Sequence, residues 1–351
     1  MLEIKKRQSN LELFRIVSMF VIVAHHYVVN SGLLNCVTAY STHDLLILVF
    51  GWGGKTAINC FVLITGYFMC TVDLDLKDKK SVRTYLVKLL RLIAEIEFYN
   101  ISMYFIFLLT GYQKFDILDC FKAFMPIDSI RDGFTSCFLT FYLIIPFLAK
   151  FTQRMSEQEH RYLIGVLLLI YTVFPSVGMD VSFNYVTWFS VLFIIASYIR
   201  LHSTDSCIIQ EKYFNETRLW GCLTLLMLMI SWASILSVRY NDLYFYVSDA
   251  NKILALITAV CAFMFFKNLN VPYSRVINKI AASTYGVLVI HANSDTMRQW
   301  LWKDVFNNVG HYEKTFPYAI GVVCLVYIVC TLIDMLRINV LEKPIFKVDR
   351  R

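Results

Sequence analysis

Charge is scarce in this sequence. Only 17% of its 351 residues are Asp, Glu, Lys or Arg, whereas soluble domains carry about 25%. Proline is also rare, at six residues, and the motifs HExxH, GxSxG and CxxC are absent, as is a glycine-rich phosphate loop. The low charge argues against a soluble globular domain. The missing motifs leave the common zinc, serine-hydrolase and dithiol enzymes without support.

The ten cysteines show neither a metal-binding spacing nor a paired framework. Most of them lie in apolar runs, where a thiol behaves as a small, polarizable hydrophobic side chain. We expect unpaired thiols, including Cys36 and Cys120 in segments expected outside, and no metal site.

Long apolar runs dominate the chain. Hydrophobic residues make up 58% of it, and the mean hydropathy is +0.57. The stretches "LWGCLTLLMLMISWASILSV" (219–238) and "PYAIGVVCLVYIVCTLIDML" (317–336) each reach the length of ~20 residues that crosses a bilayer core. The sequence therefore predicts an all-α, polytopic transmembrane helix bundle, with 1–351 forming a single membrane-embedded domain.

About ten spans are expected. They cover 11–29, 50–70, 86–110, 134–150, 162–178, 184–201, 219–238, 252–267, 279–292 and 317–336. The glycine-rich "GWGGK" (51–55) predicts a break at the start of the second span. A short interfacial or re-entrant piece is expected within 112–127.

Lysine and arginine set the expected orientation. If the N-terminus is cytoplasmic, every segment on the inside carries three to five of these residues, as the positive-inside rule requires. Both termini are therefore expected in the cytoplasm. This topology accounts for the net charge of +7, so no nucleic-acid partner is needed to explain it.

The first span, "ELFRIVSMFVIVAHHYV" (12–28), contains Arg15, His25 and His26. Ionisable groups at a span centre cost about 2.5–3.5 kcal/mol on insertion scales and commonly mark a functional interior. Arg15 and His26 are eleven residues apart, so they share one helix face about 16 Å apart along the axis. His26 suits a general base, because a histidine pKa lies near neutrality. His25 points about 100° away and is expected to pack or to bond a carbonyl.

The third span carries a polar stripe. Lys88, Arg91 and Glu95 are spaced to lie on one helix face. An Arg91–Glu95 ion pair that merely joins helices is one interpretation. The alternative is a basic mouth on the cytoplasmic side, because two cations exceed one carboxylate. Such a mouth favours a phosphate-bearing ligand, and a coenzyme A thioester has the required charge and long arm.

The second span offers Lys55 and Asn59, four residues apart on one face. They are candidates for the acceptor side of a substrate site, together with Glu95. A solvated helix end for Lys55 and a packing amide for Asn59 remain open as alternatives.

Six segments resemble the acyltransferase-3 family of integral membrane O-acyltransferases. The first helix places Arg15 and His26 at the family's arginine and histidine spacing, and a late block places His291 on the family's late histidine. The resemblance covers most of the chain and rests on the order of short motifs. Beyond the first helix these are "AINCFVLITGYFM" (57–69), "VKLLRL" (87–92), "FYLIIPFLAKF" (141–151), "INKIAASTYGVLVIHAN" (277–293) and "IDMLRINVLEKPIFK" (333–347).

The resemblance implies transfer of an acyl group, usually acetyl, from cytoplasmic acetyl-CoA to a sugar hydroxyl. The acceptor would be a bacterial cell-surface polysaccharide or its lipid-linked repeat unit, at the plasma (inner) membrane. Arg15, Lys88 and Arg91 would hold the phosphates of acetyl-CoA, and His26 and His291 would be catalytic. The doubled histidine leaves open whether His25 takes part in catalysis. Lysine at position 88 departs from the family's arginine. Without a soluble domain, the chain is expected to act alone or with a separate partner.

Two other functions remain in competition. A polysaccharide flippase or transporter would use the intramembrane charges to line a path, without chemistry. A polysaccharide polymerase would favour a long, arginine-rich outer loop, which the predicted topology lacks. The acceptor sugar, the identity of the acyl group and the oligomeric state stay undetermined at this level.

Overall fold

The computed structural model describes residues 8–37, 41–127, 133–202, 213–237, 245–313 and 316–346. Throughout these ranges the chain is helical, without a β-strand. Six helical segments in them are long and apolar enough to cross a membrane. They are α1 (Ser9–Val29), α2 with α3 (Thr42–Gly51 and Gly54–Met69), α4 (Lys79–Leu109), α6 (Phe134–Thr152), α11 (Thr217–Ser237) and α16 (Phe316–Arg337) with the helical turns after it. The predicted all-α class is confirmed, and these six segments are candidate membrane spans.

The other four expected spans are short or interrupted. Two are apolar helices of 17 and 16 residues, α9 (Tyr185–Leu201) and α12 (Ile253–Asn268). A third is divided among α7 (Glu157–Leu168), the π-helical η2 (Leu169–Val173) and α8 (Phe174–Ser176). The fourth is two helices, α13 (Arg275–Ala281) and α14 (Thr284–His291). Ten continuous spans are therefore not confirmed, and the cytoplasmic termini stay a prediction, since 1–7 and 347–351 lie outside the described residues.

The second span begins earlier than expected and then breaks. The expected start was residue 50. In the structure a capping box of Ser41 and Asp44 starts α2 at Thr42. The predicted glycine break falls between α2 and α3. A Cβ atom at Gly53 would lie 2.3 Å from the Val21 side chain, and one at Gly54 would lie 2.2 Å from the His25 ring. Glycine is required here because α3 starts directly against α1.

Short helices fill several connections. The expected interfacial piece contains α5 (Ile117–Ala123), and η1 (Leu33–Cys36) follows α1. The segment after α14 lies between two expected spans, and it is helical. It forms α15 (Asp295–Gln299), which Ser294 caps, followed by the π-helical η3 (Trp300–Val305). After α16 the chain continues as η4 (Ile338–Glu342) and α17 (Lys343–Ile345).

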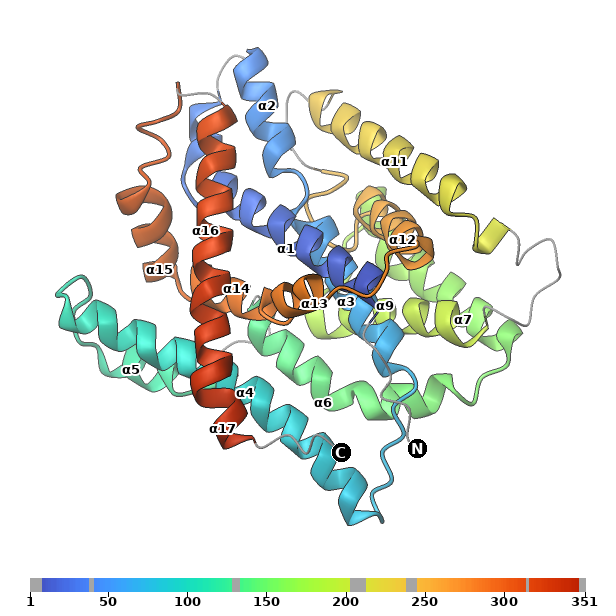
Figure 1. The fold of residues 1–351 in the computed structure, drawn as a ribbon. Coiled ribbons are helices and arrows are strands. Elements are labelled where there is room, and N and C mark those ends of the chain that lie inside the picture. Colours follow the sequence, from blue (N-terminus) through green and yellow to red (C-terminus); the bar gives the residue numbers. More distant parts are fainter. Residues whose placement is uncertain are drawn as a thin grey trace.

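The first helix is the centre of the bundle. It packs against α2, α3, α12, α13, α14 and α16, and Figure 1 shows it crossing the middle of the fold, with α16 beside it and α4 and α6 below. The buried apolar side chains of these helices form one large cluster. The ionisable residues of α1 therefore face other helices on most sides.

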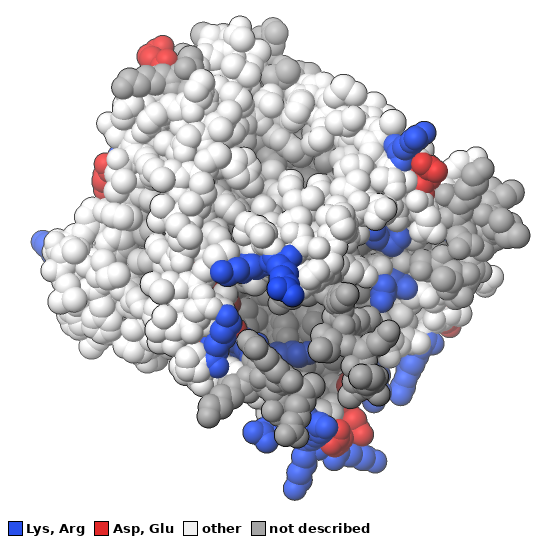
Figure 2. All heavy atoms as spheres, in the orientation of Figure 1, with Lys and Arg blue, Asp and Glu red and all other residues white. Residues whose placement is uncertain are grey.

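The two ends of the bundle differ in charge. Figure 2 shows that most Lys and Arg side chains visible on this face gather in its lower half, whereas the upper left is nearly free of them. The start of α4 carries Lys79, Lys80 and Arg83. This distribution agrees with the charge asymmetry on which the expected topology rests.

Candidate active site

The two histidines predicted to be catalytic meet, although 265 residues separate them in the sequence. Nδ1 of His26 lies 2.9 Å from Nε2 of His291, and the ring centroids are 5.1 Å apart. His26 stands in the last turn of α1, and His291 is the last residue of α14. The packing of α14 along α1 brings them together.

The hydrogen bonds of the pair fix where its protons lie when both rings are neutral. Nδ1 of His291 is 2.6 Å from the carbonyl oxygen of Val287. A carbonyl only accepts, so this Nδ1 carries the hydrogen and Nε2 of His291 is an acceptor. Nδ1 of His26 must then donate to it, which leaves a lone pair on Nε2 of His26. His291 is fully buried and His26 only partly, so His26 is the ring that a substrate can reach.

Aromatic side chains enclose the pair on one side. The indole of Trp302 stands edge-on to His291, with centroids 6.2 Å apart, and Tyr27 is 6.0 Å from Trp302. Trp302 is fully buried and belongs to η3. In the sequence Trp302 ends the aromatic stretch "RQWLW" (298–302) between two expected spans, where tryptophan is typical of an interfacial belt.

His25 serves a different contact, as expected. Its Nδ1 lies 2.6 Å from the carbonyl oxygen of Gly51, and Gly54 leaves room for its ring. The ring therefore fastens α1 to the break between α2 and α3. The carbonyl-bonded interpretation is confirmed.

Of the three cations assigned to the donor, Arg15, Lys88 and Arg91, two pair with different carboxylates in the described part of the chain. Arg15 is 3.5 Å from Glu12 and lies over the ring of Phe68, at 5.8 Å. Arg91 is 3.5 Å from Glu342. Lys88 is exposed near the start of α4. No contact among the described residues joins the three into one cluster.

An ionic network connects α4 to α16. Arg337 uses Nε, Nη1 and Nη2 for Asp334 at 2.8 Å, Glu342 at 3.0 Å and Glu95 at 3.1 Å. The hydroxyl of Tyr99 donates to Asp334 over 2.9 Å. We call Glu95, Tyr99, Asp334, Arg337 and Glu342 the Arg337 network.

The Arg91–Glu95 pair, one of the two interpretations of the polar stripe on α4, does not form among the described residues. Glu95 pairs with Arg337, and Arg91 pairs with Glu342. Sequence reasoning assigned no role to Asp334, and it met Arg337 only in the count of inside cations and in the closing segment 333–347. The available signal was Asp334 itself, an acid near the end of an apolar span, since such residues are rare unless they are paired.

One helix touches both polar groups. A Cβ atom at Gly286 would lie 2.2 Å from the carboxyl carbon of Asp334, so α14 presses directly on the Arg337 network. His291, five residues later on α14, contacts His26. The network thus helps to fix the helix that carries His291.

The two predicted acceptor-side residues of α3 bind neighbouring helices. Nζ of Lys55 donates to the Tyr185 hydroxyl over 2.6 Å and is 3.6 Å from Asp249. Asn59 is fully buried; it accepts from the Trp188 indole over 2.8 Å and donates to the Ala250 carbonyl over 2.6 Å. In this conformation Asn59 has no exposed atom for a substrate. Substrate contact by Lys55 stays a prediction.

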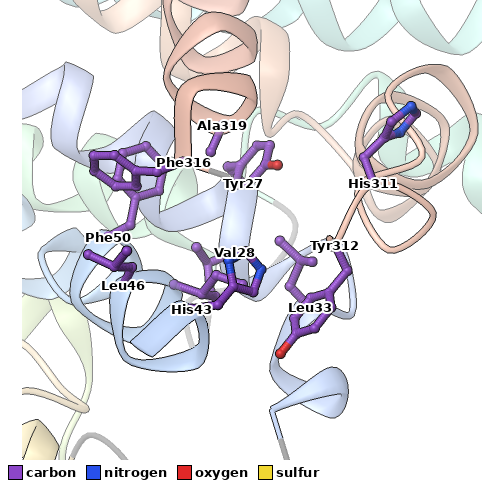
Figure 3. A pocket seen from close by; sticks show the side chains of 11 residues that line it. Tyr27, Val28, Leu33, His43, Leu46, Phe50, His311, Tyr312, Phe316 and Ala319 are labelled. Atoms are coloured by element: carbon purple, nitrogen blue, oxygen red, sulfur yellow. The ribbon is translucent and has the colours of Figure 1, made fainter. Parts of the chain in front are cut away.

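A small pocket lies beyond Tyr27, between α1, α2 and α16. Figure 3 shows the rings of Phe50 and Phe316 on one side of it and Tyr312 on the other. Tyr312 donates to Asp44 at the start of α2, and the pocket has no Lys, Arg, Asp or Glu in its lining. Tyr27 connects this uncharged end to the histidine pair through Trp302.

Comparisons with known proteins give one match. The family model described as an acyltransferase domain matches residues 8–335. This range includes both histidines of the pair, Glu95 and Asp334. Searches among curated proteins and among solved structures give no match.

Proposed function

The chain belongs to the acyltransferase-3 family, and on that premise we propose that it acetylates a bacterial surface glycan. The family and the apolar helices make it a membrane acyltransferase. The proposed donor is cytoplasmic acetyl-CoA. The proposed acceptor is a hydroxyl of a cell-surface polysaccharide or of its lipid-linked repeat unit, and the proposed location is the plasma (inner) membrane.

The histidine pair is the observation that carries this proposal. Nε2 of His26 takes the proton of the acceptor hydroxyl while the hydroxyl oxygen attacks the thioester carbonyl. The new C–O bond forms, the C–S bond breaks, and the departing thiolate receives the proton from His26. General-base catalysis of this kind contributes about 10²–10⁴ in rate.

His291 acts in this scheme as a positioning residue. Its Nε2 accepts from Nδ1 of His26 at 2.9 Å, so it selects the tautomer with a free Nε2 lone pair. When His26 becomes an imidazolium, the same hydrogen bond becomes charge-assisted and stronger. The Val287 carbonyl holds His291 in the matching tautomer.

The two ends of the bundle suit the two substrates. The nucleotide of acetyl-CoA is anionic and fits the basic end, where Arg15 stands about 16 Å along α1 from His26. A sugar hydroxyl would approach from the end that holds the aromatic pocket near Tyr27. Lys55 lies toward that end and would contact the acceptor, whereas Glu95 is committed to Arg337.

The test is the O-acetyl content of the purified glycan. Acetate released by mild base is measured in the parent strain, in a deletion strain, and in deletion strains that carry the wild-type or the His26→Ala gene. Acetate should disappear on deletion and return only with the wild-type gene, at equal membrane abundance of both proteins.

The same strains separate the competing functions. Loss of surface glycan with unchanged acetylation of the remaining lipid-linked units would indicate a transporter. Shortened chains with unchanged acetylation per repeat would indicate a polymerase. Either result would overturn the proposal.

A further inference from the structure

Two cations at the ends of neighbouring helices have no carboxylate partner. Arg200 is in the last turn of α9, and Lys267 is in the last turn of α12. In the described ranges no Asp or Glu lies within ion-pair distance of either. By contrast, Arg15, Arg91 and Arg337 each have a carboxylate at 3.5 Å or less.

Both cations are held by neutral groups instead. Nη1 of Arg200 donates to the Tyr67 hydroxyl over 2.8 Å. Nζ of Lys267 donates to the amide oxygens of Asn268 at 3.0 Å and Asn215 at 3.4 Å. Amide and phenol oxygens orient a cation without cancelling its charge, so the positive charge remains available to an anion.

Aromatic rings fix the position of each charge. The guanidinium of Arg200 lies 4.8 Å from the ring centroid of Tyr67, and the ammonium of Lys267 lies 4.8 Å from that of Phe214. Both side chains are partly buried. These are cation–π distances. They indicate that the two charged side chains are preorganised by aromatic contacts.

The two charges are joined through α3, which packs on both α9 and α12. Tyr67 of α3 accepts from Arg200 and also packs on Phe263, one turn before Lys267, with centroids 5.5 Å apart. The next residue after Tyr67 is Phe68, over which Arg15 lies. The ends of α1, α3, α9 and α12 therefore bring three cations to one region.

Two partly desolvated cations side by side are unfavourable unless an anion joins them. A phosphate group satisfies both, since a guanidinium binds phosphate through two hydrogen bonds and an ammonium adds a point charge. Arg15 and Arg91 are less suited to the main contact, because each already has a carboxylate at 3.5 Å, from Glu12 and Glu342 respectively.

We propose that Arg200 and Lys267 bind a phosphate of the acyl donor's nucleotide, next to Arg15. This inference rests on the proposed function, because it assumes a coenzyme A thioester as donor. It moves the main phosphate contact from α4 to the ends of α9 and α12. Arg91 then serves to hold the segment after α16 against α4.

An anionic lipid headgroup offers the same phosphate chemistry at a membrane surface. The experiment therefore uses the full-length protein in nanodiscs of zwitterionic lipid, and in parallel with one third anionic lipid. Binding of acetyl-CoA and transfer from S-acetylpantetheine are both measured. The second donor has the thioester and the arm but no phosphate.

Arg200→Gln and Lys267→Gln are expected to weaken acetyl-CoA binding about tenfold or more each, in both lipids, because each removes a charge-assisted contact. Transfer from S-acetylpantetheine should stay at the wild-type rate, which also shows that the variants fold. Arg161→Gln is the control. Arg161 is on the side expected in the cytoplasm but already pairs with Glu157 at 3.3 Å, so acetyl-CoA binding should not change.

Unchanged acetyl-CoA affinity in both variants would overturn the inference while leaving the proposed function intact. A loss of affinity that appears only with anionic lipid would assign the site to a lipid headgroup and would overturn it as well. If the wild-type protein binds acetyl-CoA in neither lipid and uses neither donor, the proposed function itself fails.

Discussion

The histidine pair and the Arg337 network are both polar groups inside a membrane bundle. They differ in whether a nitrogen atom remains available to a substrate. In the network all three guanidinium nitrogens of Arg337 contact carboxylates. In the pair a single chain of hydrogen bonds runs from His26 through His291 to a carbonyl, and one ring nitrogen of His26 stays open. In the network each guanidinium nitrogen has a carboxylate beside it, whereas the neutral histidine pair keeps a free lone pair for chemistry.

The two groups are mechanically connected through α14. Gly286 rests on Asp334, and His291 contacts His26. The network therefore has a positioning role for the pair, in addition to joining α4 and α16. The following variants separate the chemical role of one group from the structural role of the other.

The largest effect is expected for His26→Ala. Loss of the base should lower the transfer rate of the purified protein about 10²–10⁴-fold, with a loss of stability no greater than about 1–3 kcal/mol, as expected when a buried hydrogen-bond partner is removed. Release of coenzyme A from acetyl-CoA in the presence of the glycan acceptor measures the rate. If the variant unfolds at the assay temperature, so that unfolding alone explains the lost rate, His26 has a structural role.

Arg337→Met should mainly lower the stability of the protein, whereas His26→Ala mainly lowers the transfer rate. Replacing Arg337 leaves the carboxylates of Glu95 and Asp334 in the bundle without a cation, whereas Glu342 keeps Arg91. Breaking a buried ion pair on one side costs about 3–5 kcal/mol. Thermal unfolding in detergent should occur at a clearly lower temperature. Arg161→Met, which removes an exposed pair, should change the unfolding temperature little. Equal stability of the two variants would contradict the structural role of the network.

Gly286→Ala tests the connection between the groups. The added methyl would meet the Asp334 carboxyl, and such overpacking costs about 1–3 kcal/mol. Both stability and transfer rate should fall, because α14 must shift. Gly321→Ala on α16 is the matched control, since a Cβ atom there meets nothing within 4 Å. A Gly286→Ala protein with wild-type stability and rate would show that α14 does not couple the two groups.

The smallest effect is expected for His25→Ala. It removes one hydrogen bond to the Gly51 carbonyl, which is worth about 0.5–1.5 kcal/mol. Substantial transfer activity should remain in the coenzyme A release assay. Activity as low as that of His26→Ala would mean that both adjacent histidines take part in catalysis.

The sequence predicted helices better than it predicted partners. Apolar runs located the long helices, and the glycines at 53 and 54 located the break before α3, because both signals are local. The Arg91–Glu95 pair, one of the two interpretations of the α4 stripe, was also a local inference, from spacing along one helix. Arg337, more than two hundred residues later, pairs with Glu95 instead, and no spacing rule within α4 could indicate it.

The candidate site shows the same limit. The face of α1 that holds Arg15 and His26 followed from helix geometry, and His291 followed from a family resemblance. That their ring nitrogens meet, and that Trp302 covers them, depends on how α14 and η3 pack on α1. Asn59 was selected for its position on a helix face, but its two amide atoms are occupied by Trp188 and Ala250, which only the packed structure reveals.

The most direct test of the account compares His291→Gln, His291→Leu and each of them combined with His26→Ala. A glutamine oxygen can still accept from Nδ1 of His26, whereas leucine cannot. Single-turnover transfer from radiolabelled acetyl-CoA should therefore fall about 10–100-fold in His291→Leu, as for other groups that orient a reacting histidine, and recover in part in His291→Gln. In the His26→Ala background neither change should matter further, because His291 acts through His26. If the His291 effects persist undiminished when His26 is absent, His291 works independently and the paired mechanism is wrong.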